Sequence, residues 1–273
     1  MKTIGVDELK SIQLEMLDVV ANFCEERGIN YWVDCGTLIG AIRHKGYIPW
    51  DDDIDVGMLR PDYDRFIQEF NGTYPRYEFH CIENDPDFYK PFGKVYDKNT
   101  VLYEPDESGV KMAVNIDIFV YDNAPDNALK CRTMLLRHLI YTKLNDARVV
   151  PVFKRPNGNV IRKILVYILR AVAHIVPYRF LPYNYFAVKA IQNSRRYIHE
   201  NTKRVGNFTG LTPITWSKEI FRSFIDVEFE GRKYKAPVGY DEWLRGFYGD
   251  YMQLPPEKER YSRHSFKAYW IHE

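Results

Sequence analysis

The spacing of apolar residues divides the chain into helices and strands. Apolar side chains recur at helical intervals over 7–27, and Gly28 follows at the position where a left-handed residue usually ends a helix. The run 29–35 has the composition of a strand, and Thr37 is placed to cap the helix that follows it. The other predicted strands cover 77–82, 92–97, 112–121 and 224–229, and the other predicted helices cover 38–45, 62–70, 130–145, 160–176, 183–200 and 241–247.

Four aspartates stand within the stretch 51–55, among residues that favour strands. Alternation along a strand predicts Asp53 and Asp55 on one face, with Ile54 and Val56 packed inward on the other. Two carboxylates on one face repel each other unless a cation or a proton intervenes, and a divalent metal with oxygen ligands meets that need. A solvated acidic turn is the simpler interpretation, but such a turn does not need apolar residues between its acids.

The other two aspartates of this cluster are predicted to have different roles. Asp52 points to the opposite face and is assigned to holding the loop, against Arg43 or Lys45. Asp51 shares the face of Asp53 by parity, but it precedes the regular part of the strand, so we assign it no role. The cluster therefore divides into two predicted ligands and two supports.

Composition places the chain among globular proteins. Hydrophobic residues make up 45% of the 273 positions and charged residues 27%, which excludes a disordered chain and suits one large domain, with or without an insertion. The first 17 residues lack the apolar run of a signal peptide. The four cysteines are widely spaced, which indicates reduced thiols of a cytosolic protein and favours neither a zinc site nor a cysteine nucleophile.

The net charge of +1 conceals an uneven distribution. The segment 124–204 contains 16 Lys and Arg residues against three Asp and Glu, so the rest of the chain is acidic. The predicted helix 160–176 is too short and too charged to span a bilayer, but it can lie on anionic headgroups with its apolar face down. The alternative is a helical subdomain that covers the sheet and turns a basic face to water.

Three predicted elements carry groups suited to phosphate chemistry. Gly36 and Thr37 stand at the start of a helix, where backbone N–H groups and the helix dipole favour a phosphate. Asp53 and Asp55 on the adjacent strand can hold Mg²⁺ against that phosphate, and Asp117 on a later strand offers a further ligand or a base. Taken alone, an aspartate within an apolar run such as Asp117 is also typical of a hydrogen-bonded core residue.

The residues 36–55, GTLIGAIRHKGYIPWDDDID, closely resemble the signature of the LicD family. Its members transfer phosphocholine, or a related phospho-alcohol, from a CDP-linked donor to a cell-surface glycan, and fukutin and fukutin-related protein belong to the same group. Further segments that resemble the family are 93–97 with Thr100, 116–119, and 248–252 with 254–256 and His264. The resemblance runs over about 31–121 and 224–264, whereas the basic segment between them carries no motif of the family.

The resemblance implies an α+β fold of the nucleotidyltransferase, or polymerase-β-like, type, with a mixed sheet, flanking helices and a basic helical insertion. The implied domain limits are a catalytic core at 1–123, the insertion at 124–205, and a part at 206–273 that completes the catalytic domain. By position, the implied catalytic residues, which also bind Mg²⁺ or Mn²⁺, are Asp53, Asp55 and Asp117. The implied substrate-binding residues are Gly36, Thr37, Arg43, Lys94 and His264.

Three of these implied residues keep an ordinary alternative. Lys94 approaches the donor phosphates by resemblance, although a lysine at a strand end usually lies in solvent. Arg43 is either structural, paired with Asp51 or Asp52, or a ligand of phosphate. His264 is a general acid–base group or a phosphate ligand by its place, although a lone histidine near a terminus more often has neither role.

The implied reaction is in-line transfer of a phospho-alcohol. The expected partners are a CDP-linked alcohol as donor and a lipid-linked glycan as acceptor (a teichoic acid, lipopolysaccharide or capsule precursor), with no nucleic-acid polymer. A sugar hydroxyl attacks the distal phosphorus, Asp117 takes the proton, and CMP leaves. The expected location is the cytoplasm, with peripheral contact between 124–205 and the inner membrane face.

Three other functions compete with this one. Nucleotidyl transfer, which makes the CDP-alcohol, needs the same carboxylates, and only its product, pyrophosphate instead of CMP, separates the two. A glycosyltransferase with an Asp-x-Asp motif fits less well, because the first 50 residues leave no room for the expected βαβ repeat. A non-catalytic membrane module need not keep Gly36, Asp53, Asp55 and Asp117 together.

Overall fold

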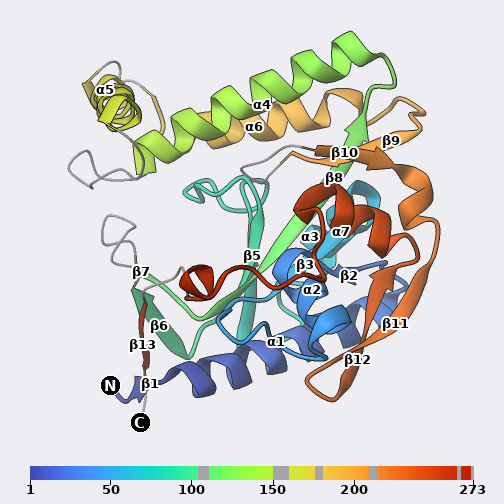
Figure 1. Cartoon of the computed structure of the whole chain (residues 1–273). Helices are drawn as coiled ribbons and strands as arrows, with labels where there is room; N and C mark the ends of the chain where they lie inside the picture. The colour runs from blue at the N-terminus through green and yellow to red at the C-terminus, as the bar shows by residue number, and fades with distance from the viewer. Residues whose placement is uncertain (104–110, 150–159, 176–180, 209–213, 263–265, 272–273) are drawn as a thin grey trace.

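A mixed sheet of seven strands lies at the centre of the molecule (Figure 1). The structure is a computed structural model, and it describes residues 1–103, 111–149, 160–175, 181–208, 214–262 and 266–271. Five strands follow the order β10-β9-β8-β3-β2, and β5 and β4 extend the sheet beside β8. The strands are β2 (Trp32–Val33), β3 (Asp55–Leu59), β4 (Tyr77–His80), β5 (Gly93–Asp97), β8 (Asn115–Ala124), β9 (Arg204–Asn207) and β10 (Ile214–Ser217).

Strand β8 organises this sheet because it pairs with three others. It runs parallel to β3, and it is antiparallel to β5 along its first half and to β9 along its second half. Ile116, Ile118 and Val120 alternate along it and are buried, as expected for a strand with one face in the core. Asp117 therefore points to the opposite face from these three residues.

Helices and a hairpin cover the sheet around β3 and β8. Helices α1 (Val6–Arg27) and α3 (Arg60–Glu69) contact β8, and α2 (Cys35–Arg43) packs against β3. The hairpin of β11 (Phe224–Phe229) and β12 (Arg232–Pro237) contacts α2 and β2. Helix α7 (Tyr240–Tyr248) follows the hairpin and leads the chain back over α2.

A second, four-stranded sheet joins the two ends of the chain. Strand β13 (Lys267–Trp270) lies between β1 (Thr3–Ile4) and β6 (Thr100–Tyr103), and β7 (Lys111–Met112) follows at the edge. All of these pairings are antiparallel. The C-terminal segment is therefore held beside the N-terminus, as Figure 1 shows at the lower left.

The basic segment is helical, as predicted. It contains α4 (Ala128–Val149), α5 (Val160–Ile175) and α6 (Tyr185–Ser194), and α6 packs along α4 (Figure 1). Asn193 donates from Nδ2 to the carbonyl of Met134, 3.0 Å away, and Asn145 donates to the carbonyl of Tyr89. These amide contacts fasten the helices to each other and to the loop ahead of β5.

The predicted α+β fold with a mixed sheet is confirmed, and the individual elements differ in detail. The helix expected over 7–27 is α1, and Gly28 ends it in the left-handed conformation. The strand expected over 29–35 shrinks to Trp32–Val33, because the next helix already begins at Cys35. The short strands that the sequence did not indicate are β1, β6, β7, β9, β10, β12 and β13.

The predicted domain limits stay a prediction. Strand β9 (Arg204–Asn207) crosses the expected limit between 205 and 206, and it pairs with the second half of β8. Strand β13 pairs with β1 and β6 of the expected core. Residues from the end of the basic segment onward thus complete the two larger sheets of the described chain.

A buried ion pair fastens α3 to the sheet. Arg60, at the start of α3, donates from Nε and Nη2 to the two carboxylate oxygens of Asp122 on β8, at 2.7 and 2.9 Å. The side chains are 3% and 0% exposed, so the pair is shielded from water and salt. Asp64 and Glu83 lie against the same guanidinium. Because α3 directly follows β3, this pair also holds the end of β3 against β8.

Replacing Arg60 by alanine should lower the free energy of unfolding by about 3–5 kcal/mol, because Asp122 would stay buried without its cation. Urea denaturation followed by circular dichroism measures the change. The control, Arg222→Ala, removes an exposed guanidinium 3.9 Å from Glu219 and should change stability by no more than about 0.5 kcal/mol. Equal losses in the two variants would show that the buried pair does not hold the sheet.

Candidate active site

The turn between β2 and α2 begins the site. Asp34, rather than Thr37, occupies the N-cap position, and α2 starts at Cys35, whose φ of 44° is left-handed. The prediction that Thr37 caps the helix is therefore wrong. Thr37 lies inside the first turn, and its hydroxyl accepts a hydrogen bond of 2.9 Å from the backbone N–H of Asp55. The buried threonine thus joins α2 to the first residue of β3.

Asp34 is a buried acid that the sequence did not single out. The hydroxyl of Tyr121 on β8 donates to Asp34 Oδ2 at 2.8 Å, and the backbone N–H of Asp34 donates to the carbonyl of Asp55. Burial raises the pKa of Asp34 to about 6, against the hydrogen bond from Tyr121, which lowers it. This group therefore links the α2 turn to both β3 and β8.

The acidic cluster is arranged differently from the predicted strand. Strand β3 begins only at Asp55, so Asp53 lies in the preceding loop and the expected alternation does not apply to it. Asp55 is paired directly with Asp117 across the parallel strands β3 and β8. Side chains at paired positions point to the same face, with neighbouring strands about 4.8 Å apart. The sheet register therefore brings together two of the three predicted ligands, Asp55 and Asp117.

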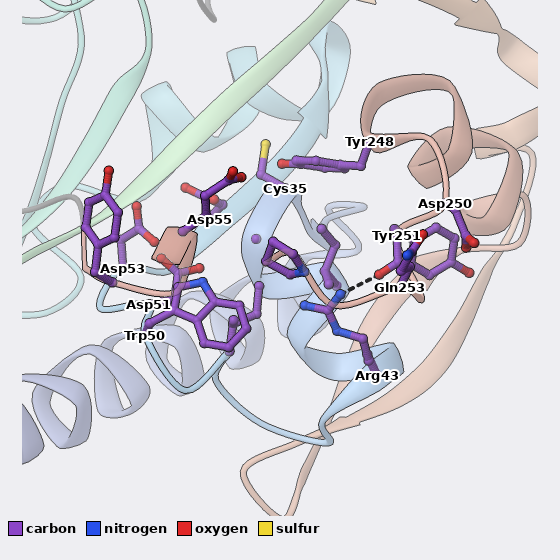
Figure 2. Close-up of a pocket in the computed structure, with 16 residues that line it drawn as sticks. Cys35, Arg43, Trp50, Asp51, Asp53, Asp55, Tyr248, Asp250, Tyr251 and Gln253 are labelled. Carbon is purple, nitrogen blue, oxygen red and sulfur yellow. Dashed lines mark hydrogen bonds between the residues drawn. The ribbon is translucent and has the colours of Figure 1, made fainter. Parts of the chain in front are cut away.

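A cavity of about 650 Å³ opens beside Asp55 (Figure 2). One side is formed by α2 and the loop before β3, and the other by the end of α7 and the segment after it. Gly36 and Arg43 lie in its wall, and Asp53 and Asp55 face it from the acidic cluster. The lining residues are Cys35, Gly36, Ile39, Arg43, Ile48, Trp50, Asp51, Asp53, Asp55, Tyr248, Asp250, Tyr251, Gln253, Pro255, Glu259 and Tyr261.

Gly36 is needed for the close approach of Asp51. A Cβ atom on Gly36 would lie 2.6 Å from Asp51 Oδ2, which is too close for two non-bonded atoms. The missing side chain thus lets a carboxylate rest against the first turn of α2. Asp51, to which the sequence assigned no role, is part of the cavity wall.

Asp117 and Lys94 face a second, smaller cavity. Lys94 on β5 is paired in register with Asp117, and its Nζ donates to Asp117 Oδ1 at 2.5 Å and to Asn115 Oδ1 at 2.8 Å. This space of about 70 Å³ is also lined by Asp53, which faces the larger cavity as well. Lys94 is buried rather than solvated. Asp53 lies at the border of the two cavities, because it lines both of them.

The electrostatics of Asp55 favour a cation beside it. Burial raises the pKa of Asp55 well above its usual range, and the carboxylates of Asp53 and Asp117 raise it further. Oxygen donors of this kind suit Mg²⁺ or Mn²⁺, so the donor chemistry fits the metal. Across the part of the chain that the structure describes, however, no three acidic, histidine or cysteine side chains already surround a metal position. Asp117 is held by Lys94 instead.

Cys35 also lies in this acidic surrounding. Burial raises the pKa of its thiol well above the ordinary value, and Asp34 and Asp55 act in the same direction. A thiol of this kind is a poor nucleophile, because the thiolate is the reactive form. Cys35 is free, as are the other three cysteines.

Two further predicted residues have partners in the C-terminal part of the chain. Arg43 donates from Nη1 to the carbonyl of Tyr251 and from Nε to His44 Nε2, so it fastens α2 to the segment after α7. Asp52 accepts a hydrogen bond of 2.8 Å from the hydroxyl of Ser262. His264, which was expected to bind substrate, lies outside the described residues. The roles of Gly36, Thr37, Arg43 and Lys94 in substrate binding stay predictions.

The sequence did not identify several residues of the cavity wall. The residues concerned come from the loop before β3 and from the segment 248–261. The resemblance over 248–252 was a signal for this segment, but it did not indicate that the segment would lie across from α2. The residues missed are Trp50, Asp51, Tyr248, Asp250, Tyr251, Gln253, Glu259 and Tyr261.

The chain is similar to known proteins of one family. A family model described as "LicD/FKTN/FKRP, nucleotidyltransferase domain" matches residues 28–161. The lipopolysaccharide cholinephosphotransferase LicD of Haemophilus influenzae is 33% identical over 98% of this chain and 99% of its own length. Human ribitol 5-phosphate transferase FKRP is 44% identical over 16% of this chain and 9% of its own. Mouse ribitol-5-phosphate transferase FKTN is 35% identical over 18% of this chain and 11% of its own.

The contact between Gly36 and Asp51 can be tested by a double-mutant cycle. Gly36→Ala should lower the free energy of unfolding by about 1–3 kcal/mol, because the new methyl group meets the carboxylate. In an Asp51→Ala background the same change should be neutral or stabilising by up to about 1 kcal/mol, since alanine is the better helix former. Thermal and urea unfolding of the four proteins measure both effects. An equal cost in the two backgrounds would contradict the contact.

Proposed function

The chain belongs to the LicD family, and on that premise we propose that it moves phosphocholine, or a closely similar phospho-alcohol, from a CDP-linked donor to a hydroxyl of a cell-surface glycan. The chain is a LicD-type transferase, since the likeness to the Haemophilus influenzae protein covers nearly its whole length. The names of that relative and of FKRP share the transfer of a phospho-alcohol. Transfer of a phospho-alcohol to a glycan is the coarser function that these likenesses support.

The proposal rests on one cavity whose wall combines the N-terminal turn of a helix with carboxylate side chains. The first turn of α2, with Gly36, presents backbone N–H groups and the positive end of a helix dipole, which suit a phosphate. Asp53 and Asp55 face the same space. A diphosphate bridge is negative, so it can lie beside these carboxylates only with a cation between them.

We propose that this cation is Mg²⁺ or Mn²⁺ and that Asp53, Asp55 and Asp117 would hold it. Such an ion would neutralise charge on the diphosphate and on the leaving CMP. The support for it is the donor set: hard carboxylate oxygens, two of them on paired strands, in surroundings that raise the pKa of Asp55. Asp117 needs to exchange its contact with Lys94 for this role, and the ammonium of Lys94 would then donate to a phosphate oxygen.

The chain's own residues account for orientation and for proton transfer. The α2 turn holds the diphosphate, and Arg43, 2.5 Å from the carbonyl of Tyr251, keeps the C-terminal segment closed over the cavity. The acceptor hydroxyl attacks the phosphorus that bears the alcohol, in line with the departing CMP. Asp117 takes the hydroxyl proton in this scheme, because it lies at the same face of the sheet as Asp55.

The walls of the cavity favour a cationic alcohol such as choline. Its described lining contains five carboxylates against the single guanidinium of Arg43, and four aromatic rings: Trp50, Tyr248, Tyr251 and Tyr261. Aromatic faces together with acids are the usual surroundings of a quaternary ammonium group. The ring of Trp50 already attracts a cation, since the Arg260 guanidinium lies 5.8 Å from its centre. Ribitol and glycerol are neutral and would gain nothing from this charge.

Asp55→Asn should reduce transfer by roughly a hundred-fold or more while the protein stays folded, because the replacement keeps the shape but removes the charge. Release of CMP from CDP-choline, with saturating Mg²⁺ and a glycan acceptor, measures it. The control, Asp226→Asn, changes an exposed aspartate of β11 that pairs with Lys235 and does not line the cavity. Near-wild-type turnover of Asp55→Asn would refute the metal and catalytic assignments.

A donor screen tests the substrate. CDP-choline, CDP-ribitol and CDP-glycerol are compared for Mg²⁺-dependent release of CMP, and CDP-choline should be preferred by about ten-fold or more. The preference should fall in Glu259→Gln, which removes one wall charge, and should not change in Asp226→Asn. Equal use of all three donors would contradict the cationic pocket. Release of pyrophosphate from CTP and phosphocholine would instead identify the chain as the enzyme that makes the CDP-alcohol.

A further inference from the structure

Helix α5 has its apolar face turned away from the protein. Val160, Ile161, Ile164, Leu165 and Ile168 are between 53% and 70% exposed. They stand at successive positions i, i+1, i+4, i+5 and i+8 of one helix, so they form a single stripe along it. Such a contiguous apolar surface is rare on a soluble monomer and marks a surface that meets a partner.

Two of the three Lys and Arg residues of α5 lie on its other side, and the third, Arg162, is exposed. Lys163, Val166 and Arg170 recur at helical spacing and are half-buried, and α5 contacts α4. Helices that cover a core place their apolar residues inward and their charges outward. Helix α5 has the reverse arrangement, so burial against its own chain does not explain its apolar stripe.

Helix α4 continues the pattern with bases among its exposed apolar residues. Leu129, Leu136, Leu139 and Ile140 are between 38% and 75% exposed. Lys130, Arg132, Arg137 and Lys143 are exposed on the same helix. The two helices together carry eight Lys and Arg residues and a single acid, Asp146. Figure 1 shows both at the end of the molecule opposite α1.

We propose that the outward faces of α4 and α5 form a docking surface for an anionic lipid bilayer. The apolar stripe enters the boundary between headgroups and acyl chains, and the surrounding bases meet phosphate groups of the lipids. No helix within the described residues has both the length and the apolar character to cross a membrane. This inference concerns binding and does not depend on the proposed function.

Charge complementarity selects a lipid surface over a second copy of the chain. Two copies joined through these faces would bring both basic sets together, and like charges at close range oppose association. An anionic bilayer satisfies both features at once, because it offers an apolar interior beneath negative headgroups. Neutral lipid would satisfy only the apolar stripe.

Flotation of the purified chain with lipid vesicles tests the surface. With vesicles of equal parts phosphatidylglycerol and phosphatidylcholine, the protein should float with the lipid, and added salt should weaken binding. With phosphatidylcholine alone, binding should be about ten-fold weaker or more, since each basic residue near an anionic surface contributes substantially. Absence of the protein from the floating fraction with anionic vesicles would overturn the proposal.

Paired variants distinguish the stripe and the bases from general stickiness. I161D/L165D should lower the partition coefficient by about a hundred-fold, and R132E/K143E by about ten-fold or more. The matched controls are Val6→Asp, at an exposed apolar position of α1, and R222E/K233E, at exposed bases outside α4 and α5. Circular dichroism and thermal unfolding check that all four variants fold.

The controls should bind vesicles as the unchanged chain does. If I161D/L165D bound as well as the unchanged chain, a different surface would carry the binding, and the proposal would be wrong. Sedimentation velocity tests the other candidate partner of this surface, a second copy of the chain. Concentration-dependent dimers that I161D/L165D abolishes, without any vesicle binding, would assign the stripe to contact between copies and would also overturn the proposal.

Discussion

The register of β3 on β8 is the constraint on which the site depends. Asp55 lies opposite Asp117 because the two strands pair in parallel at that position, and a slip by one residue would turn one of these carboxylates to the other face. The buried Arg60–Asp122 pair joins the start of α3, directly after β3, to the far end of β8 and so supports that register. An ion pair outside both cavities therefore helps to position the two acids.

The buried acids of the site suit the binding of a cation, but they oppose the stability of the fold. Asp34, Asp55 and Asp53 are acids near one another, and burial raises the pKa of Asp34 and Asp55, which means that the folded protein disfavours their charged forms. The hydrogen bond from the hydroxyl of Tyr121 to Asp34 and the one from the backbone N–H of Asp55 to Thr37 hold Asp34 and the backbone in place, but they bring no positive charge. The fold thus holds a group of acids whose charged forms a bound cation would stabilise.

The parts of the fold that local pattern determines were predictable, and the parts that tertiary pairing determines were not. Helix α1 followed from its apolar period and its terminal Gly28, and Asp117 was expected on a strand, whereas the register that sets Asp55 opposite Asp117 is a tertiary pairing that no local pattern contains. The two-residue strand at Trp32–Val33 is defined by pairing with β3, which no local signal contains. In the same way, the sequence around Tyr248 resembled the family, but nothing in it indicated that this segment would face Asp51 across a cavity.

Helices α1 and α5 show why periodicity alone does not identify the partner of an apolar face. Both have an apolar stripe, and in α1 it is buried against the sheet, whereas in α5 it is exposed. Charge separates the two cases. The polar side of α1 carries acids and bases, as expected of a face in water, whereas α5 carries only bases and turns two of them toward its own chain. A helix with half-buried bases and an exposed apolar stripe gains stability when something outside the chain covers the stripe, and its basic residues favour an anionic cover.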